Sequence, residues 1–261
     1  MTPRTDPECP VTDLAPSADR PDDGGRSGPD HTGATAEGAA AASARPGSGT
    51  VAVLGAGRVG TAIARVAMRS GYRVRLAASG DPKLIELIAQ IMAPGALTAT
   101  AAEAVAPADL VILAVPLGKH TTLDGDALAG KIVVDAMNYW PSTDGRDPEL
   151  ETAPSTSEVV ARHLTRSAVV KTLNHIGYHD LEEQGRPAGN PGRRALAVAG
   201  DDPDATAFVR TFVDRLGFDP VDAGDLAAGV HLQPGTPVFN GQHDATTLVT
   251  LLREAPAAVG H

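Results

Sequence analysis

The fold of this chain is decided by residues 51–60, which read VAVLGAGRVG. The apolar run at 51–54 is typical of a short strand that is buried on both faces of a parallel sheet. A helix is predicted to follow over residues 59–70, and Gly71 stands where a left-handed residue commonly ends a helix. The apolar face of that helix is formed by Val59, Ile63, Val66 and Ala67. A strand, a glycine turn and a helix therefore open the folded part of the chain.

The glycines of this turn follow the pattern G-x-G-x-x-G, and each is expected to have its own task. Gly55 turns the chain sharply, Gly57 lets the backbone approach a pyrophosphate, and Gly60 lets the helix pack on the strand. The free N–H groups at the start of the helix add a partial positive charge that favours phosphate. Because the pattern lies between a strand and a helix, it predicts a dinucleotide site. The alternative is a glycine-rich turn that binds nothing.

Strands and helices continue to alternate along the rest of the chain. Further strands are predicted at 72–77, 110–114, 131–134, 168–173, 194–199 and 219–221. Further helices are predicted at 82–92, at 158–164 with Ser157 as N-cap, and from Pro203 onward with Asp202 as N-cap and Gly217 just past the end. This alternation indicates an α/β fold of the Rossmann type, doubly wound, with a mostly parallel sheet and a small C-terminal extension.

Composition divides the chain into four parts. Residues 1–48 are rich in Pro, Gly, Ser and Ala and carry almost no large apolar side chains, so a disordered tail is expected there. Residues 49–176 hold the predicted dinucleotide-binding Rossmann domain, and residues 177–240 a smaller C-terminal region on the substrate side. Residues 241–261 show the weakest pattern and are expected to form a weakly structured C-terminal tail.

The charge and the cysteine content exclude several classes of protein. The net charge of −10 disfavours nucleic acid and anionic membranes as partners. Cys9 is the only cysteine, so an internal disulfide and a cysteine-rich metal site are excluded. The sequence has no apolar stretch of about 18 residues for a membrane span, and residues 1–30 lack the apolar segment of a signal peptide. We therefore expect a cytoplasmic protein that binds a small molecule, and a homodimer is a reasonable expectation.

The residues after the second predicted strand indicate which dinucleotide binds. An enzyme that uses NAD usually carries Asp or Glu there, about 20 residues after the glycine pattern, to accept from the ribose 2′-hydroxyl. Residues 77–80 read AASG and provide no carboxylate. Ser79, the amide of Gly80 and Lys83 are candidates to bind a 2′-phosphate instead. NADP(H) is therefore favoured over NAD(H).

With these features the chain resembles the family of NADP-dependent oxidoreductases of the deazaflavin coenzyme F420, from about Val51 to Phe239. The resemblance is carried by the glycine loop and by AVPL at 114–117, KIVVDA at 131–136, residues 169–181, VAGDD at 198–202 and DPVDAG at 219–224. It implies hydride transfer between NADP(H) and F420, with F420 as co-substrate. The chain departs from the family at Gly80, where an arginine is usual, and at Asn174, where a histidine is usual.

The resemblance and the residues themselves together indicate which residues contact each ligand. Contacts to the cofactor are expected from Gly55, Ala56, Gly57, Arg58, Val59, Gly60, Ser79, Gly80, Lys83, Val115, Pro116, Leu117, His120 and Ala136. The substrate side is expected to comprise Met137, Asn138, Tyr139, Asn174, His175, Ile176 and Gly177. Within these sets, Val115 and Pro116 would flank the nicotinamide ribose, and Asn174 and Ile176 would position the two reacting rings. His120 either touches the ribose or caps the helix that follows.

Other residues suggest further features of the substrate side. Tyr139 and Trp140 form either a wall for a planar ligand or a patch that packs against another part of the protein. The candidates to meet an anionic acceptor are Arg186, Arg193 and Arg194. His175 and His179 have the spacing of two metal ligands on a helix, but Gly177 lies between them and argues against a helix. No metal site is therefore predicted.

Three interpretations of the activity remain open at this point. Direct hydride transfer to a deazaflavin depends mainly on positioning, and the sequence carries no hydrolase or zinc-protease motif. A second possibility is an NADPH-dependent reductase of an imine or carbonyl metabolite, motivated by Asn174 and Gly80. A third is a non-catalytic NADP(H) sensor or scaffold, whose acidic N-terminal tail recruits a partner.

Overall fold

The structure is a computed structural model that describes residues 49–79 and 82–255. These residues belong to one compact unit of the chain, residues 43–261. The tail expected at 1–48, the cofactor candidate Gly80 and the last six residues lie outside the described residues. Within the described part, no helix has both the length and the apolar character required to cross a bilayer.

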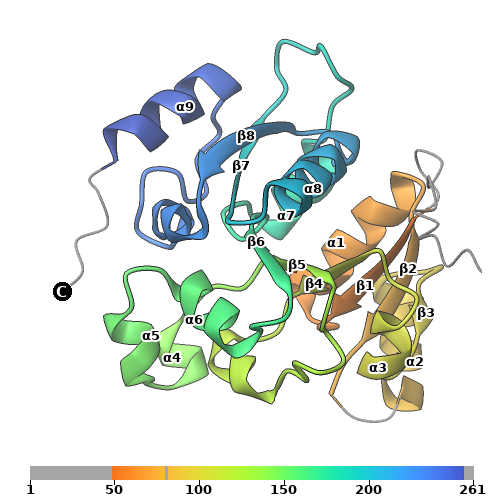
Figure 1. Ribbon diagram of the computed structural model, residues 1–261. Helices are drawn as coiled ribbons and strands as arrows, with labels where there is room; N and C mark the ends of the chain where they lie inside the picture. The colour runs from red at the N-terminus through yellow and green to blue at the C-terminus, as the bar shows by residue number, and fades with distance from the viewer. Residues whose placement is uncertain (1–48, 80–81, 256–261) are drawn as a thin grey trace, which may run out of the picture. The chain divides into compact units, whose positions relative to one another are not determined.

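One eight-stranded sheet forms the centre of this unit, in the order β3-β2-β1-β4-β5-β6-β7-β8 (Figure 1). The strands are β1 (Thr50–Leu54), β2 (Arg73–Ala77), β3 (Leu97–Thr98), β4 (Leu110–Leu113), β5 (Ile132–Asp135), β6 (Ala168–Lys171), β7 (Ala195–Gly200) and β8 (Asp219–Gly224). Neighbouring strands are parallel except for β6 and β7, which are antiparallel. The order reverses beside β1, which is where ligands bind in open α/β sheets. The predicted fold class is confirmed.

Helices cover both faces of the sheet. One face packs against α1 (Arg58–Arg69), α2 (Pro82–Met92), α7 (Tyr178–Glu183) and α8 (Pro203–Leu216). The other packs against α3 (Ala101–Val105), α5 (Pro148–Thr152), α6 (Thr156–His163) and the short 3₁₀ helices η1 (Leu117–Thr122) and η2 (Leu226–Leu232). A four-residue helix, α4 (Pro141–Asp144), follows the loop after β5. Each face buries its own apolar core, so the strands read as almost continuous apolar runs.

Several predicted helix ends are confirmed by their hydrogen bonds. At the end of α1, Gly71 has a φ of +89°, a value that glycine adopts without strain. Asp202 caps α8 because its side chain accepts from the N–H of Ala205. Gly217 ends the same helix with a φ of +102°. These ends were predictable because each depends on a few neighbouring residues.

Two expectations about side chains were wrong. Ser157 is not the N-cap of α6: the cap position belongs to Ser155, and Ser157 lies inside the helix with its hydroxyl donating to Asp135. Val59 does not belong to the buried face of α1, because it lies in the first turn, beyond the edge of the sheet, and is 38% exposed. Ser157 makes a contact with the distant residue Asp135, whereas Val59 has no packing partner among the described residues that buries it near the loop. The helical pattern alone predicts neither.

The C-terminal part departs from the expected division of the chain. The sheet continues past residue 176, since β7 pairs with β6 and β8 with β7. Residues 241–261, expected to be a weakly structured tail, contain α9 (Ala245–Glu254). This helix is capped by Asp244, and Leu248 is buried with β7 and β8 on the face that α8 does not cover. Its sequence pattern was weak because Leu248 is the only residue of α9 that is fully buried.

Candidate functional site

The glycine loop has the geometry that its sequence predicted. Gly55 has a φ of +128°, and a Cβ on it would lie 2.2 Å from the carbonyl oxygen of Ala114. A Cβ on Gly60 would lie 1.8 Å from the carbonyl oxygen of Gly55. A Cβ on Gly57, by contrast, would meet no described heavy atom within 4 Å. Gly55 and Gly60 are therefore required by packing inside the protein, whereas Gly57 faces open space.

The N-terminus of α1 offers unpaired backbone N–H groups beside this space. Gly57 is the N-cap, its extended backbone carries no capping side chain, and the first turn contains no acidic residue. Arg58 and Val59 are exposed there, and the hydroxyl of Thr61 donates to the carbonyl oxygen of Gly57 rather than competing for an N–H group. The first N–H groups of a helix need an external acceptor, and an anion is the favoured one. A pyrophosphate fits this cradle.

A cavity of about 210 Å³ adjoins the glycine loop at the carboxyl ends of β1, β2 and β4. Its lining is mostly apolar, and it comprises Leu54, Gly55, Ala77, Ala78, Ser79, Ala101, Ala102, Val105, Val115, Thr122, Leu123, Asp124, Ala127 and Leu128. Position and apolar lining suit the adenosine part of a dinucleotide. A larger cavity of about 590 Å³ lies at the amino ends of β5 and β6, away from the loop, and does not belong to this site.

Of the candidates for a 2′-phosphate, Ser79 lies at the smaller cavity. Ser79 follows β2, is exposed and lines the cavity. Lys83 lies in the first turn of α2 with an exposed side chain. Of the three predicted residues, the structure thus places Ser79 at the cavity and Lys83 in the helix that follows, and Gly80 lies outside the described residues.

The predicted nicotinamide side starts at the end of β4. Val115 is half-buried and Pro116 is exposed, so both are accessible from the loop side. Leu117 is fully buried, and Ala136 is 4% exposed at the end of β5. His120 is buried, and its Nδ1 lies 3.0 Å from the carbonyl oxygen of Leu117. This bond closes its own turn, η1, and is neither of the two roles left open for His120.

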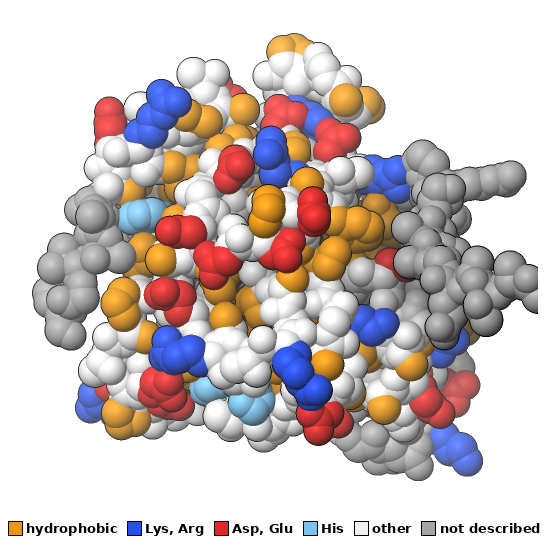
Figure 2. All heavy atoms as spheres, viewed as in Figure 1, with side chains coloured by type: hydrophobic (Ala, Val, Ile, Leu, Met, Phe, Trp, Pro, Cys, Tyr) orange, Lys and Arg blue, Asp and Glu red, His pale blue; other side chains and the backbone are white. Residues whose placement is uncertain are grey.

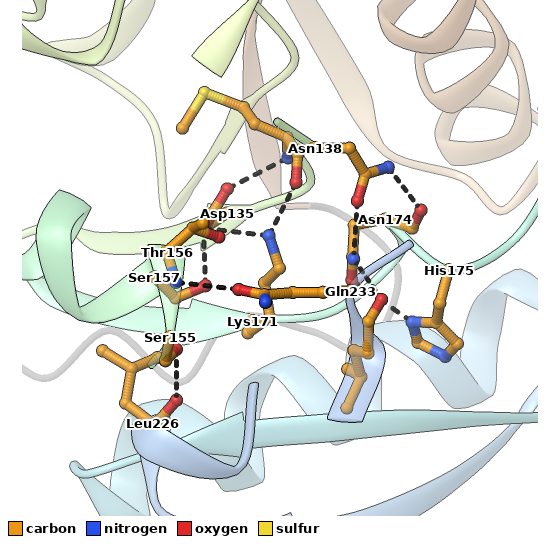
Figure 3. A network of polar contacts seen from close by, with 12 residues as sticks. Asp135, Asn138, Ser155, Thr156, Ser157, Lys171, Asn174, His175, Leu226 and Gln233 are labelled. Carbon is orange, nitrogen blue, oxygen red and sulfur yellow. Dashed lines mark hydrogen bonds and ion pairs between the residues drawn. The ribbon is translucent and has the colours of Figure 1, made fainter. Parts of the chain in front are cut away.

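A fully buried ion pair joins the ends of β5 and β6 (Figure 3). Asp135 and Lys171 are opposite each other in the register of the two strands, and both are 0% exposed. Lys171 Nζ lies 3.1 Å from Asp135 Oδ2, to which Ser157 also donates at 2.7 Å. Burial lowers the pKa of Lys171, and the carboxylate of Asp135 opposes that effect.

The same pair holds the main chain of Met137. Lys171 Nζ donates to the carbonyl oxygen of Met137 at 2.6 Å. Asp135 Oδ1 accepts from the N–H of Met137 at 3.0 Å. Both polar backbone groups of Met137 are therefore held by the ion pair, which fixes the start of the loop after β5.

A second layer of hydrogen bonds joins this loop to the loop after β6 (Figure 3). Asn138 Nδ2 donates to the carbonyl oxygen of Asn174 at 2.8 Å, and Asn174 Nδ2 donates to Asn138 Oδ1 at 3.0 Å. Asn174 also donates to the carbonyl oxygen of Leu232 at 2.7 Å. Leu173, just before Asn174, has a φ of +65°, which is strained for a residue with a Cβ. The amide of Asn174 is thus used within the protein.

His175 is held in one neutral form. Its Nε2 accepts from the N–H of Ala197 at 3.1 Å, so the proton resides on Nδ1, which lies 3.3 Å from Asn174 Oδ1. Burial, reinforced by the positive charges of Arg194, Lys171 and His243, lowers the pKa of His175 to about 3. His175 is therefore neutral at physiological pH and has no titratable proton to exchange with a ligand.

The remaining residues of the predicted substrate side differ in their exposure. The hydroxyl of Tyr139 donates to the carbonyl oxygen of Gly145 at 2.9 Å, so this ring braces the loop before α5. Trp140 is 46% exposed and packs edge-to-face on Phe239, with ring centroids 6.0 Å apart. Ile176 is 6% exposed within the core beside α1. Of the predicted aromatic wall, Trp140 alone presents a substantial surface.

The arginines proposed for an anionic acceptor are mostly engaged with the protein. Arg193 is buried and pairs with Asp214 at 2.8 Å and with Asp219 at 2.7 Å. Arg194 is buried and pairs with Asp180 at 3.0 Å. The third candidate, Arg186, is exposed and donates to main-chain carbonyls of its own loop.

The two histidines with metal-ligand spacing do not share a helix face. Gly177 is the N-cap of α7, so His175 precedes the helix and His179 lies within it. His179 is exposed beside Tyr178, whereas His175 is buried. Among the described residues, no group of three His, Cys, Asp or Glu side chains is arranged to hold a metal ion.

Sequence reasoning missed the residues that organise the substrate side: Asp135, Lys171 and Ser157. A signal was present, because Asp135 and Lys171 are charged residues that end two otherwise apolar strands, IVVD and AVVK. Charged residues at such positions are buried only when they are paired. The pairing itself required the register of β5 and β6.

Comparison with known proteins shows what this chain is similar to. Residues 50–139 match the family described as NADP oxidoreductase, coenzyme F420-dependent. A proposed F420-dependent NADP reductase of known crystal structure, from Arthrobacter sp. FB24, is 30% identical, with a TM-score of 0.59 over 70% of this chain and 89% of that one.

Two curated proteins match over shorter shares of their length. Protein YjhV of Escherichia coli K12 is 43% identical over 95 residues, which are 36% of this chain and 60% of that protein. Metalloreductase STEAP3 of Rattus norvegicus is 30% identical over 184 residues, which are 68% of this chain and 34% of that protein. The chain therefore spans less than two thirds of either curated relative.

Proposed function

Because this chain belongs to the family of NADP oxidoreductases that depend on coenzyme F420, we propose that it transfers a hydride between NADP(H) and the deazaflavin F420. The observation that carries the proposal is the open space in front of Gly57, beside the uncapped N-terminus of α1. Only a glycine leaves room there for a diphosphate to reach the backbone N–H groups.

Each part of the cofactor has residues suited to it. The N–H groups at the start of α1 bind the pyrophosphate, and the cavity lined by Ala77 and Val105 takes the adenosine. Ser79 and Lys83 bind the 2′-phosphate, and the family supports NADP(H) over NAD(H). Val115 and Pro116 border the nicotinamide ribose. When bound, NADP(H) supplies the hydride, and the protein supplies orientation and electrostatics.

On the acceptor side, hydride transfer depends on how the rings are positioned and requires no proton-transferring side chain. Hydride transfer needs two ring carbons held at close approach. The loops after β5 and β6 are joined by the reciprocal hydrogen bonds between the amides of Asn138 and Asn174. His175 beside them is neutral and buried, so it holds its proton on Nδ1 and orients the loop.

The test is to mix the protein with NADPH and F420 and to follow the visible absorbance of the deazaflavin. We expect bleaching that depends on protein concentration, faster with NADPH than with NADH. The Gly57→Val variant should bleach F420 far more slowly. Binding of NADPH without bleaching between about pH 5 and about pH 9 would contradict F420 as the acceptor.

A second candidate is an NADPH-dependent reductase of an uncharged imine or carbonyl metabolite. It is favoured by the ion pairs of Arg193 and Arg194, which engage these arginines with carboxylates of this chain. Oxidation of NADPH with a panel of imines and ketones, in the absence of F420, distinguishes this reaction from the first. NADPH binding with no turnover of either acceptor class supports the third interpretation, a sensor or scaffold.

A further inference from the structure

The buried ion pair of Asp135 and Lys171 is more than a support for the sheet. Two charges removed from water cost free energy that a pair of apolar side chains would not cost, so such a pair is a poor source of stability. Here the pair lies at the last register position of β5 and β6, where the two strands end and the loops of the substrate side begin.

The contacts of the pair are directed at one residue of the loop. Asp135 Oδ1 accepts from the N–H of Met137, and Lys171 Nζ donates to its carbonyl oxygen. Ser157 holds Asp135 from the side of α6 with a 2.7 Å hydrogen bond. Apolar side chains could fill the same volume but could not hold Met137 at both of its polar groups.

The position of Met137 constrains the loop after β5, which is hydrogen-bonded to the loop after β6. Asn138 follows directly and makes the reciprocal amide pair with Asn174. Trp140 lies three residues after Met137 in the same loop and is half-exposed. The strained backbone of Leu173 persists only because its surroundings fix it.

We propose that Asp135 and Lys171 are positioning residues, which set the loop after β5 so that the hydride acceptor is held in register with the nicotinamide. The inference rests on the proposed function in that the acceptor binds beside this loop. Both residues are fully buried, and the pair acts through the main chain of Met137.

The decisive variant is the double substitution Asp135→Asn with Lys171→Met. It leaves no unpaired buried charge, and the new amide can still accept from the N–H of Met137 and bond to the hydroxyl of Ser157, but the carbonyl oxygen of Met137 loses its donor. We expect the Kd for NADPH to stay within about twofold, and kcat with F420 to fall about 10- to 100-fold. The primary deuterium isotope effect with NADPH labelled at C4 should increase, which lost stability alone would not cause.

Trp140 provides a measurement that needs no turnover, because it is the only tryptophan in the chain. In the double variant, its time-resolved fluorescence anisotropy should gain a fast local motion that is absent from the wild type. If the wild type reduces no acceptor, the proposed function fails, and the anisotropy of Trp140 still decides whether the pair positions the loop.

A matched pair of single variants covers the case in which the double variant does not fold. Ser157→Ala removes a hydrogen bond to Asp135, whereas Ser155→Ala removes an equally buried hydroxyl of the same segment that contacts Leu226 instead. We expect Ser157→Ala to lower kcat severalfold and to loosen Trp140, and Ser155→Ala to do neither. The proposal would be overturned if the folded double variant kept the wild-type anisotropy of Trp140, the wild-type kcat and the wild-type isotope effect. If the double variant is unfolded, the same result in Ser157→Ala would overturn it.

Discussion

At the scale of single residues, the glycines of the loop meet two different requirements: close packing within the protein and room for a ligand. Gly55 and Gly60 are close to other backbone atoms, so any side chain there distorts the protein itself. Gly57 meets nothing within the described residues, so a side chain there obstructs only a ligand. Binding and folding can therefore be tested separately within six residues.

The substitution Gly57→Val should weaken NADPH binding about 100-fold, which is about 2.7 kcal/mol, and leave the melting temperature unchanged. The physical reason is that the new side chain fills the space in front of the amides of α1. Fluorescence titration with NADPH and a thermal melt measure the two effects. Gly192→Val, in an exposed loop with ordinary room for a Cβ, is the control that should change neither. Unchanged affinity in Gly57→Val would refute the assigned loop.

His175 should make the folded protein less stable as the pH falls. Its pKa is about 3 in the folded protein, against 6.5 for an ordinary histidine, so below pH 6.5 the unfolded chain takes up a proton that the folded chain does not. Stability from this group is complete above pH 6.5 and should decrease by about 1.5 to 2 kcal/mol between pH 6.5 and pH 5.

Urea unfolding across that range measures this slope. The carboxylates with lowered pKa, such as Glu182 and Asp244, lose their contribution only at lower pH, so the range isolates the histidine. His175→Gln should flatten the profile, and His179→Gln, at an exposed position of α7, should not. A wild-type profile that is already flat over this range would contradict the buried neutral ring.

At the scale of elements, the helices differ in how clearly the sequence marks them. Helix α8 carries a cap, a proline at its first position and a terminal glycine, so its ends were predictable. Helix α9 also has a cap in Asp244, but Leu248 is its only fully buried residue. Its stability must come from packing on β7 and β8, which the local sequence does not reveal.

Substitution of Leu248 by Ala should therefore cost about 3 kcal/mol of unfolding free energy, as expected for a buried leucine. Chemical denaturation measures it. Leu87→Ala, at a position of α2 that is 66% exposed, serves as the control and should change stability by less than about 0.5 kcal/mol. Equal effects of the two substitutions would mean that α9 does not pack on the sheet.

At the scale of the whole molecule, one sheet carries both sides of the candidate site. The predicted cofactor side lies at β1, β2 and β4, and the predicted substrate side at β5 and β6, which share one sheet (Figure 1). Figure 2 shows acidic and basic side chains interspersed on one face, with no broad basic surface in that view.

Deletion of residues 1–42 should leave NADPH affinity within about twofold and the melting temperature unchanged. The reason is that every described residue of the cofactor side lies after Thr50, and the described residues belong to a unit that excludes residues 1–42. Titration and thermal melting of the shortened chain provide the measurement. A large loss of affinity would show that the N-terminal part takes part in binding.

The sequence by itself determined the Rossmann fold class, the glycine loop and the ends of α1 and α8. These features depend on periodicity and on a few neighbouring residues, and both can be read along the chain. The sequence also predicted Asn174 and His175 for the substrate side, but it did not predict how their side chains are used within the protein.

Only the tertiary structure decided that Asp135 meets Lys171, that Ser157 supports them rather than capping a helix, and that α9 covers β7 and β8. Asp135 and Lys171 are 36 residues apart, and they meet because two parallel strands pair in one register. A shift of that register by one residue would place the two side chains on opposite faces of the sheet. Contacts of this kind depend on how distant segments pack, which no local pattern specifies.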